Sequence, residues 1–206
     1  MLRCLLVKKV TCRNGNCQAD PPWLEMFMAT KATIYKALLN IADMDRQYYA
    51  THSLTLACHP SETEERLMVR LLAFALYASE SLQFTRGIST EDEPDLWDKD
   101  LTDHITHWIE LGVPDESRLR KGCNRADQAT LVTYGSRTAP LWWEKNRDKL
   151  KRFDNLRVIY LDRDATDALA AMAARNMELQ VTIQDGQAWF SSPDSNAAIT
   201  PEIWKP

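Results

Sequence analysis

The second half of the sequence alternates β-type segments with helical ones, and this alternation limits the folds that the chain can adopt. Short segments rich in β-branched and aromatic residues are separated by longer segments in which apolar residues recur at helical spacing. Such alternation is typical of an α/β sheet with some parallel strands. The Asp185-Gly186 pair lies between two further β-type runs and predicts a hairpin. The expected strands cover residues 129–134 and 156–162, and the expected helices cover 115–126, 138–153 and 164–177.

The first half of the patterned region predicts a β-hairpin followed by the clearest helix of the chain. Residues 32–43 and 48–57 have strand-like patterns on either side of a short turn, so we expect them to pair antiparallel. The helix should begin at Ser61, because Ser61 is a good N-cap and Glu64 stands where a capping box needs an acid. Three short strand-like segments follow, at 82–87, 93–98 and 105–112.

The first 27 residues differ from the rest of the chain. They hold three of the five cysteines and a Pro21-Pro22 pair, but no sustained helical or strand pattern. Met28 comes shortly before the patterned region, and residues 28–206 have the size of one domain. We therefore predict a single domain over 28–206 and a disordered or mis-started extension over 1–27. A genuine but mobile tail is the alternative.

The amino-acid composition limits which binding partners and which cellular compartment we expect for the protein. The formal net charge is −4 and the pI is near 5.6, so a nucleic-acid partner would need a local basic face. The five cysteines are odd in number and irregularly spaced, unlike a disulfide framework or a zinc site. No apolar run approaches the roughly 18 residues that a membrane helix requires. We expect a cytoplasmic protein with reduced thiols and no membrane partner.

Two acidic residues in apolar surroundings are the candidates for chemistry. Asp95 precedes a bulky segment, and Glu110 lies inside the apolar run 108–111. A carboxylate in such a run is costly to bury unless it is paired or bound to a metal ion. Two carboxylates on neighbouring strands could hold Mg²⁺, which prefers oxygen ligands. The pattern alone favours the simpler alternative, with Glu110 at a solvent-facing strand edge and Asp95 in a turn.

Several strings form a specific succession along the chain. They are ATIYKA, HPSETEER, LQFTRG, EPDLW, WIELGVPDE, WWEKN and VTIQDG. Together they resemble the YaeQ family of small bacterial proteins, from about Met28 to the C-terminus. The resemblance implies an α/β fold in which a mixed central sheet is flanked by helices. This fold would be a variant of the PD-(D/E)XK, or restriction-endonuclease-like, fold with an N-terminal β-hairpin.

The same resemblance implies a site of nuclease type. Asp95, with the proline before it, matches the first acid of the motif and Glu110 matches the second, so both would bind Mg²⁺ or Mn²⁺ and act in catalysis. The lysine expected two positions after the glutamate is absent, because Gly112 stands there. Lys121 on the next helix is the candidate for that catalytic charge. Glu65, on the helix after the hairpin, is the candidate for an additional catalytic acid.

Arginines in two segments are candidate contacts to nucleic-acid phosphates. They are Arg86, Arg118, Arg120 and Arg125. We therefore expect a Mg²⁺-dependent, nuclease-like hydrolase acting on nucleic-acid phosphodiesters. The alternative is a catalytically inactive nuclease-fold module that binds protein or RNA in a regulatory role. The missing lysine and the acidic net charge favour this alternative.

Overall fold

The structure, a computed structural model, describes residues 10–13, 16–19, 32–85 and 92–206, and the chain forms two units, 1–31 and 32–206. In the smaller unit, strand β1 (Val10–Arg13) pairs antiparallel with strand β2 (Asn16–Ala19). The rest of the extension predicted over 1–27 lies outside the described residues. The larger unit begins four residues after Met28 and holds all the other elements.

A five-stranded mixed sheet forms one side of the larger unit, with strand order β12-β11-β10-β3-β4. The two hairpins expected from the sequence are confirmed: β3 pairs antiparallel with β4, and β10 with β11. Parallel pairing of β10 with β3 joins the hairpins into one sheet. The strands are β3 (Thr33–Asp43), β4 (Tyr48–Cys58), β10 (Asn176–Gln184), β11 (Gln187–Ser191) and β12 (Asn196–Ile199).

A six-stranded mixed sheet has strand order β13-β9-β8-β7-β6-β5. Its central strands β7, β8 and β9 run parallel, as the alternation of strands and helices predicts, and its outer pairs are antiparallel. The strands are β5 (Gln83–Phe84), β6 (Leu96–Lys99), β7 (Ile105–Leu111), β8 (Ala126–Tyr134), β9 (Leu156–Leu161) and β13 (Glu202–Lys205).

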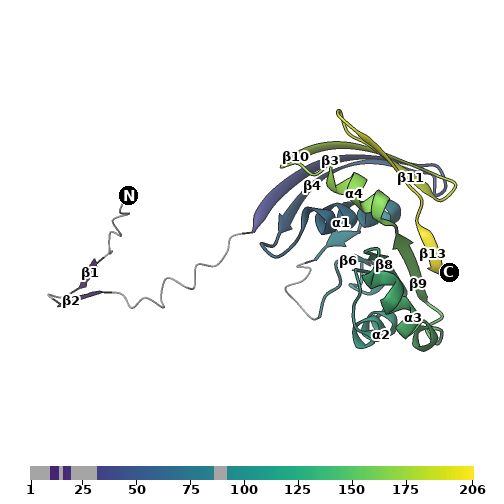
Figure 1. Cartoon of the computed structure of the whole chain (residues 1–206), viewed down its shortest axis with the longest axis horizontal. Helices are drawn as coiled ribbons and strands as arrows, with labels where there is room; N and C mark the ends of the chain where they lie inside the picture. Colours follow the sequence, from purple (N-terminus) through teal and green to yellow (C-terminus); the bar gives the residue numbers. More distant parts are fainter. Residues whose placement is uncertain (1–9, 14–15, 20–31, 86–91) are drawn as a thin grey trace. The chain divides into compact units, whose positions relative to one another are not determined.

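The helices form two layers on the six-stranded sheet (Figure 1). Helices α1 and α4 lie between the two sheets, whereas α2 and α3 cover the other face of the six-stranded sheet. The expected mixed central sheet flanked by helices is therefore confirmed in the six-stranded sheet, but the second sheet, which covers α1 and α4, was not expected. The helices are α1 (Glu64–Tyr77), α2 (Glu116–Arg125), α3 (Thr138–Leu150) and α4 (Arg163–Ala170).

Two helices begin at residues other than those the sequence predicts. Helix α1 has Thr63 as its N-cap, and its side chain accepts a hydrogen bond from the backbone N of Arg66 at 3.2 Å. Ser61, the predicted cap, bonds the ring of His59 instead. Helix α4 is capped by Asp162, two residues before the helix start predicted at Asp164. In each case another nearby oxygen satisfies the first free N–H groups of the helix.

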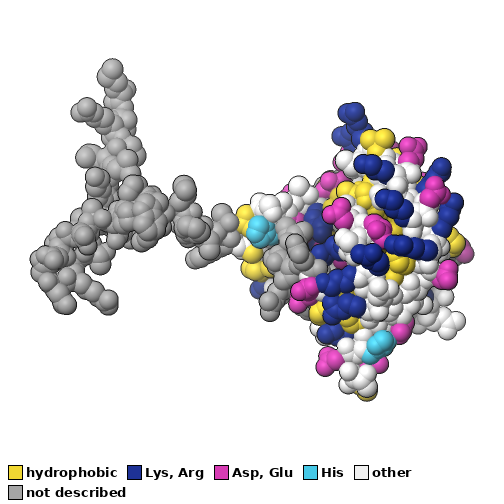
Figure 2. Space-filling model, turned by 90° about the horizontal axis from the view of Figure 1, so that it is seen from below, with side chains coloured by type: hydrophobic (Ala, Val, Ile, Leu, Met, Phe, Trp, Pro, Cys, Tyr) yellow, Lys and Arg dark blue, Asp and Glu magenta, His cyan; other side chains and the backbone are white. Residues whose placement is uncertain are grey.

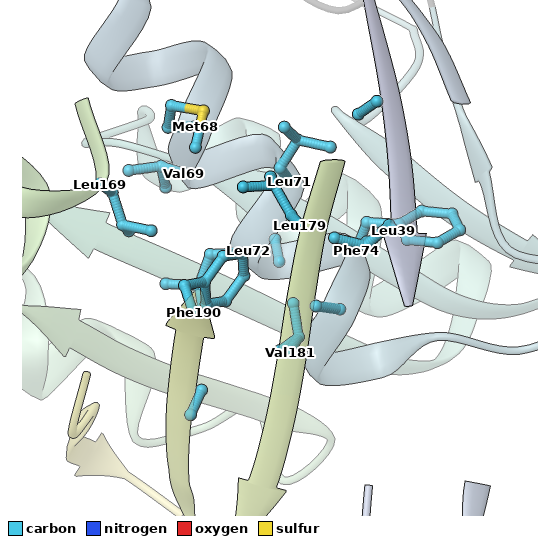
Figure 3. Close-up of a cluster of buried hydrophobic side chains, with 14 of the residues drawn as sticks. Leu39, Met68, Val69, Leu71, Leu72, Phe74, Leu169, Leu179, Val181 and Phe190 are labelled. Atoms are coloured by element: carbon cyan, nitrogen blue, oxygen red, sulfur yellow. The ribbon is translucent and has the colours of Figure 1, made fainter. Parts of the chain in front are cut away.

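Two hydrophobic clusters hold the layers together. The larger lies between the sheets, where α1 packs against β3, β10, β11 and α4 (Figure 3). The smaller lies between the six-stranded sheet and helices α2 and α3, with the fully buried Trp108 among its members. Within the described residues, no helix is both long enough and apolar enough to cross a lipid bilayer.

Candidate functional site

Asp95 immediately precedes β6 and bonds strand β7 on both sides of Glu110. Its backbone N donates to the carbonyl of Ile109 at 3.1 Å, and its Oδ2 accepts from the backbone N of Leu111 at 2.9 Å. Both acids are 2% exposed. Both carboxylates predicted to form a site are thus buried, with Asp95 bonded beside Glu110 on β7, so the simpler alternative of a solvent-facing Glu110 is wrong.

Glu110 accepts two hydrogen bonds at the same oxygen. Trp108 lies two residues earlier on β7, so it shares a sheet face with Glu110, and its Nε1 donates to Oε1 at 3.0 Å. Arg118 reaches Oε1 from α2, with its Nε at 2.9 Å. Burial raises the pKa of Glu110 to about 7, the negative charge of Asp95 adds to the rise, and Arg118 and Trp108 oppose it.

Asp95 is paired with an arginine that comes from a different helix. Arg66, in the first turn of α1, donates from Nη2 to Oδ1 of Asp95 at 2.6 Å and from Nη1 to the carbonyl of Leu111 at 3.4 Å. Burial still raises the pKa of Asp95 above its ordinary value, although Arg66 and the Leu111 amide stabilise the charged form. Helices α1 and α2 thus each supply one arginine to the acid pair.

Arg66 was missed by the reasoning from sequence, although a signal for it exists. A cation in the first turn of a helix is unfavourable, because the helix dipole is positive there. An arginine following Glu64 and Glu65 at that position therefore indicates an acidic partner elsewhere in the fold. Asp95 is that partner.

Glu65 is linked to the acid pair only through other side chains. Burial is the main cause of the raised pKa of Tyr134, and the charge of the half-buried Glu65 adds to it. Tyr134 in turn hydrogen-bonds Arg66, which holds Asp95. Glu65 therefore lies at the edge of the site, two side chains away from Asp95.

The structure gives a backbone reason for the missing lysine. Gly112 has φ +90°, a conformation that side chains other than glycine rarely adopt. Space is not the obstacle, since the atom nearest to an added Cβ would be Nη1 of Arg66 at 3.5 Å. Lys121, the predicted replacement, forms an ion pair with the exposed Asp92. Arg118, one turn earlier on α2, is the cation that contacts Glu110.

The other predicted phosphate contacts lie around the same helix. Arg118 also donates to the carbonyl of Glu93 at 2.6 Å. Arg125 donates to the carbonyl of Asp92 at 3.1 Å and lies over the Trp108 ring, whereas Arg120 is exposed. Arg86 lies outside the described residues.

The face formed by α2 and α3 is rich in basic side chains, as Figure 2 shows. Lys and Arg outnumber Asp and Glu on both helices, in a chain with a net negative charge. Among the described residues, no carboxylate lies within ion-pair distance of four exposed members of this face. These are Arg120, Lys145, Arg147 and Lys149. The local basic face that a polyanion partner needs is therefore present.

The donor set of the acid pair suits Mg²⁺ or Mn²⁺. Carboxylate oxygens are the ligands that these hard cations prefer, and a cation would relieve the repulsion between Asp95 and Glu110. In the part of the chain that the structure describes, no group of three or more His, Cys, Asp and Glu side chains has the arrangement of a metal site. Mg²⁺ is commonly held by one or two carboxylates and completes its shell with water.

Comparison with known proteins identifies the family. The sequence model of the family described as YaeQ protein matches residues 28–201. The YaeQ proteins of Escherichia coli (strain K12) and Salmonella typhi are each 51% identical over 178 residues, covering 86% of this chain and 98% of theirs. The crystal structure of YaeQ from Xanthomonas axonopodis pv. citri is similar with a TM-score of 0.82 and 52% identity, covering 84% of this chain and 98% of that one.

A second crystal structure, of YaeQ from Pseudomonas syringae, is similar with a TM-score of 0.81 and 36% identity, covering 85% of this chain and 97% of that one. The strings that carry the resemblance in the sequence lie within the matched residues. The chain belongs to the YaeQ family.

Proposed function

We propose that the protein is a divalent-cation-dependent phosphodiesterase that acts on nucleic acid, with a fold related to the PD-(D/E)XK nucleases. The observation that carries the proposal is the acid pair itself. Both side chains are buried, Asp95 is bonded to the strand residues on either side of Glu110, and the negative charge of Asp95 adds to the raised pKa of Glu110. Such closeness costs free energy, and a site that binds a cation recovers that cost when it is occupied.

Each side chain around the pair has a role in this proposal. Asp95 and Glu110 would hold Mg²⁺ or Mn²⁺, and the ion would supply a lowered pKa for a bound water and positive charge against the scissile phosphate. Arg118 supplies the fixed positive charge beside Glu110 that the motif lysine would otherwise supply. Arg66 orients Asp95. Lys121 and Glu65 act at the edge of the site, in contact with the substrate backbone rather than with the acids.

The basic face of α2 and α3 provides the binding surface. Arg118 belongs to α2, so the residue that contacts Glu110 and the residues that would contact phosphates share one helix. Phosphate contacts release condensed counterions, so binding should weaken steeply as salt concentration rises. Replacing Lys145 and Lys149 by Gln should reduce that salt dependence without changing the acid pair.

The proposal is tested by cleavage of DNA and RNA, single- and double-stranded, in Mg²⁺ or Mn²⁺ at pH 8. We expect cleavage by the unmodified chain and loss of at least 100-fold in rate for Glu110→Gln and for Asp95→Asn. The matched control is Asp167→Asn, which changes an exposed carboxylate on α4 and should leave the rate unchanged. Cleavage that survives Glu110→Gln would rule out this site as the catalytic centre.

One observation favours a second function, that of a non-catalytic module that binds RNA or protein. Each carboxylate of the pair already has an arginine partner, so neither needs a cation in order to be buried. This function predicts RNA binding in EDTA that is equally strong in the unmodified chain and in Glu110→Gln, without cleavage of any substrate. Metal-dependent cleavage lost in Glu110→Gln would contradict it.

A further inference from the structure

Strand β4 forms one edge of the five-stranded sheet, and this edge is long. The strand spans 11 residues, whereas the other edge strands of the two large sheets, β12, β5 and β13, have four, two and four residues. All 11 residues of β4 pair with β3 without a shift in register. Among its described strands, the larger unit therefore has one long and regular sheet edge.

The sequence of β4 lacks the features that protect natural edge strands from pairing with another chain. Such strands are usually short, or they carry charged residues, proline or a bulge. Strand β13 follows this rule, because it contains Glu202 and Lys205 and its pairing with β9 has a register shift. In contrast, Tyr48–Cys58 contains no Lys, Arg, Asp, Glu or Pro. The edge of β4 is thus open to a further strand.

The backbone of β4 offers hydrogen-bonding groups at alternate residues. The backbone N of Lys36 on β3 donates to the carbonyl of Arg175, which immediately precedes β10. The even-numbered residues of β3 therefore direct their backbone groups to β10, and the odd-numbered ones direct theirs to β4. The register places even-numbered residues of β4 opposite these odd-numbered ones. The odd-numbered residues of β4 consequently point their N–H and C=O groups outward.

The end of the strand agrees with this alternation. The carbonyl of Ala57 accepts from Nη1 of Arg70 at 3.4 Å, so it points away from β3, as an odd-numbered residue should. Four other odd-numbered residues have exposed side chains and two outward backbone groups each, which no described residue bonds. They are Tyr49, Thr51, Ser53 and Thr55. These groups can bind an added strand.

Apolar side chains lie at this edge on both faces of the sheet. Tyr49 is 65% exposed on the face that points away from the helices. On the helix face, Tyr48 and Leu54 pack against the larger hydrophobic cluster but are only partly buried. An added strand would cover these side chains as well as bind the backbone groups. Both contributions favour an extended segment without charge.

The same strand of a second copy fits this edge. A two-fold axis at His52 sets β4 antiparallel to itself, with Tyr49 opposite Thr55 of the other copy and Thr51 opposite its Ser53. This register uses the outward backbone groups of all four residues. Aromatic side chains with β-branched ones, and Thr with Ser, are favourable pairs across antiparallel strands.

Charge does not oppose this symmetric pairing. A two-fold axis brings residues near it close to their own copies, but burial lowers the pKa of His52, so its ring is neutral at physiological pH. Lys36, which is paired with Thr55, is the charged residue of β3 on the exposed face. The two copies of Lys36 would be six residues apart along the strands, or about 20 Å at roughly 3.3 Å per residue.

We propose that the protein forms a dimer through β4, so that the five-stranded sheets of two copies join into one continuous sheet. About nine residues of each copy take part, fewer than the roughly 20–30 of a stable interface. We therefore expect a reversible dimer with a dissociation constant on the order of 1–100 µM. The acid pair belongs to the six-stranded sheet, so this dimer and the proposed cleavage can be tested separately.

The test is sedimentation velocity of the full chain. A reducing agent is present, so that no disulfide bond can hold two chains together. We expect the sedimentation coefficient to change from that of a monomer to that of a dimer as the concentration rises from about 1 to about 500 µM. A monomer at every concentration would overturn the proposal, and so would a monomer that instead binds an added extended peptide at this edge.

Two double variants test the register. Thr51→Lys with Ser53→Lys places like charges opposite each other across the axis and should weaken association at least tenfold. Thr51→Lys with Ser53→Glu places opposite charges there and should keep the dissociation constant within about threefold of that of the unmodified chain. Both variants change the same two exposed positions, so their unfolding temperatures should be similar. Equal weakening in the two variants would contradict this pairing.

A further variant separates the edge from net charge. Gln180→Lys with Gln184→Lys adds the same charge at exposed positions of β10, a strand inside the sheet, and should leave association unchanged. If this variant weakened association as much as Thr51→Lys with Ser53→Lys, repulsion between whole molecules would explain both results. That outcome would overturn the assignment of the interface to β4.

Discussion

The carboxyl group of Glu110 has a pKa of about 7 in the folded chain, against an ordinary value of 4.5. Between these two pH values the folded state holds a proton that the unfolded state has lost. The free energy of unfolding should therefore fall as the pH rises from 4.5 to 7, by about 3 kcal/mol from this residue. Urea unfolding in EDTA at several pH values measures this fall.

Glu110→Gln should remove this part of the pH dependence, because the amide does not titrate. The matched control is Glu178→Gln, which changes an exposed glutamate on β10 and should leave the pH dependence as it is. An unchanged slope between pH 4.5 and 7 in Glu110→Gln would show that Glu110 titrates normally and is not held near neutrality by the fold.

Asp95 stabilises the fold through its two partners. Asp95→Ala would leave the Arg66 guanidinium and the backbone N of Leu111 without their acceptor. We expect a loss of about 3 kcal/mol in the free energy of unfolding, the cost of breaking a buried ion pair from one side. Asp167→Ala, at an exposed ion pair on α4, should cost less than about 1 kcal/mol. Equal losses in the two variants would contradict the buried pairing of Asp95.

At the scale of the elements, the start of α1 can be tested directly. Thr63→Ala removes the side-chain oxygen that accepts from the backbone N of Arg66, and should cost about 1 kcal/mol. Ser61→Ala should cost less than about 0.5 kcal/mol, because Ser61 bonds only the exposed His59 and its own loop. The two free energies of unfolding, measured by denaturant titration, would be reversed if the helix began at Ser61.

Helix α2 packs against the sheet through a glycine. A Cβ at Gly122 would lie 2.7 Å from the Trp108 ring, too close for the helix to keep its position. Gly122→Ala should therefore destabilise by about 1–3 kcal/mol, although alanine is the better helix former. Asn124→Ala, at an exposed position of the same helix, should be neutral or slightly stabilising in the same unfolding measurement. A stabilised Gly122→Ala would show that α2 does not rest on Trp108.

Local pattern was sufficient for the elements that depend on nearby residues. The hairpin of β3 and β4, the turn at Asp185-Gly186 and some parallel pairing were expected and are confirmed, the parallel pairs being β7 with β8 and β8 with β9. The second sheet could not be expected in this way, because it depends on the pairing of Lys36 with Asn176, which are 140 positions apart. Pattern along the sequence does not report such distant pairing.

The candidate site, too, could be predicted from the sequence only in part. Asp95 and Glu110 were candidates because acids in apolar segments need partners, but only the family resemblance, and not the residue pattern, favoured them as a site. The partners themselves were not found, because Arg66 and Arg118 arrive from two helices whose orientation depends on the packing of the layers. Lys121 was expected to face the acids, but the turn of α2 directs it to Asp92.

At the scale of the whole molecule, both hydrophobic clusters draw their described members from residue 35 onward. A variant that begins at Met28 should therefore unfold with the same free energy as the full chain, within about 0.5 kcal/mol. Denaturant titration of the two forms side by side measures the difference. A loss of several kcal/mol would show that residues 1–27 contribute to the stability of the larger unit.

The arrangement of layers brings the acid pair, Arg118 and the basic face of α2 and α3 together in one region, and this supports a nucleic-acid phosphodiester as substrate. The most direct test of that account is calorimetric titration of Mn²⁺ at pH 8, where Glu110 is ionised. The account predicts binding by the unmodified chain and by Asp167→Asn, and a loss of at least tenfold in affinity in Glu110→Gln. Equal Mn²⁺ affinity in all three proteins would contradict it.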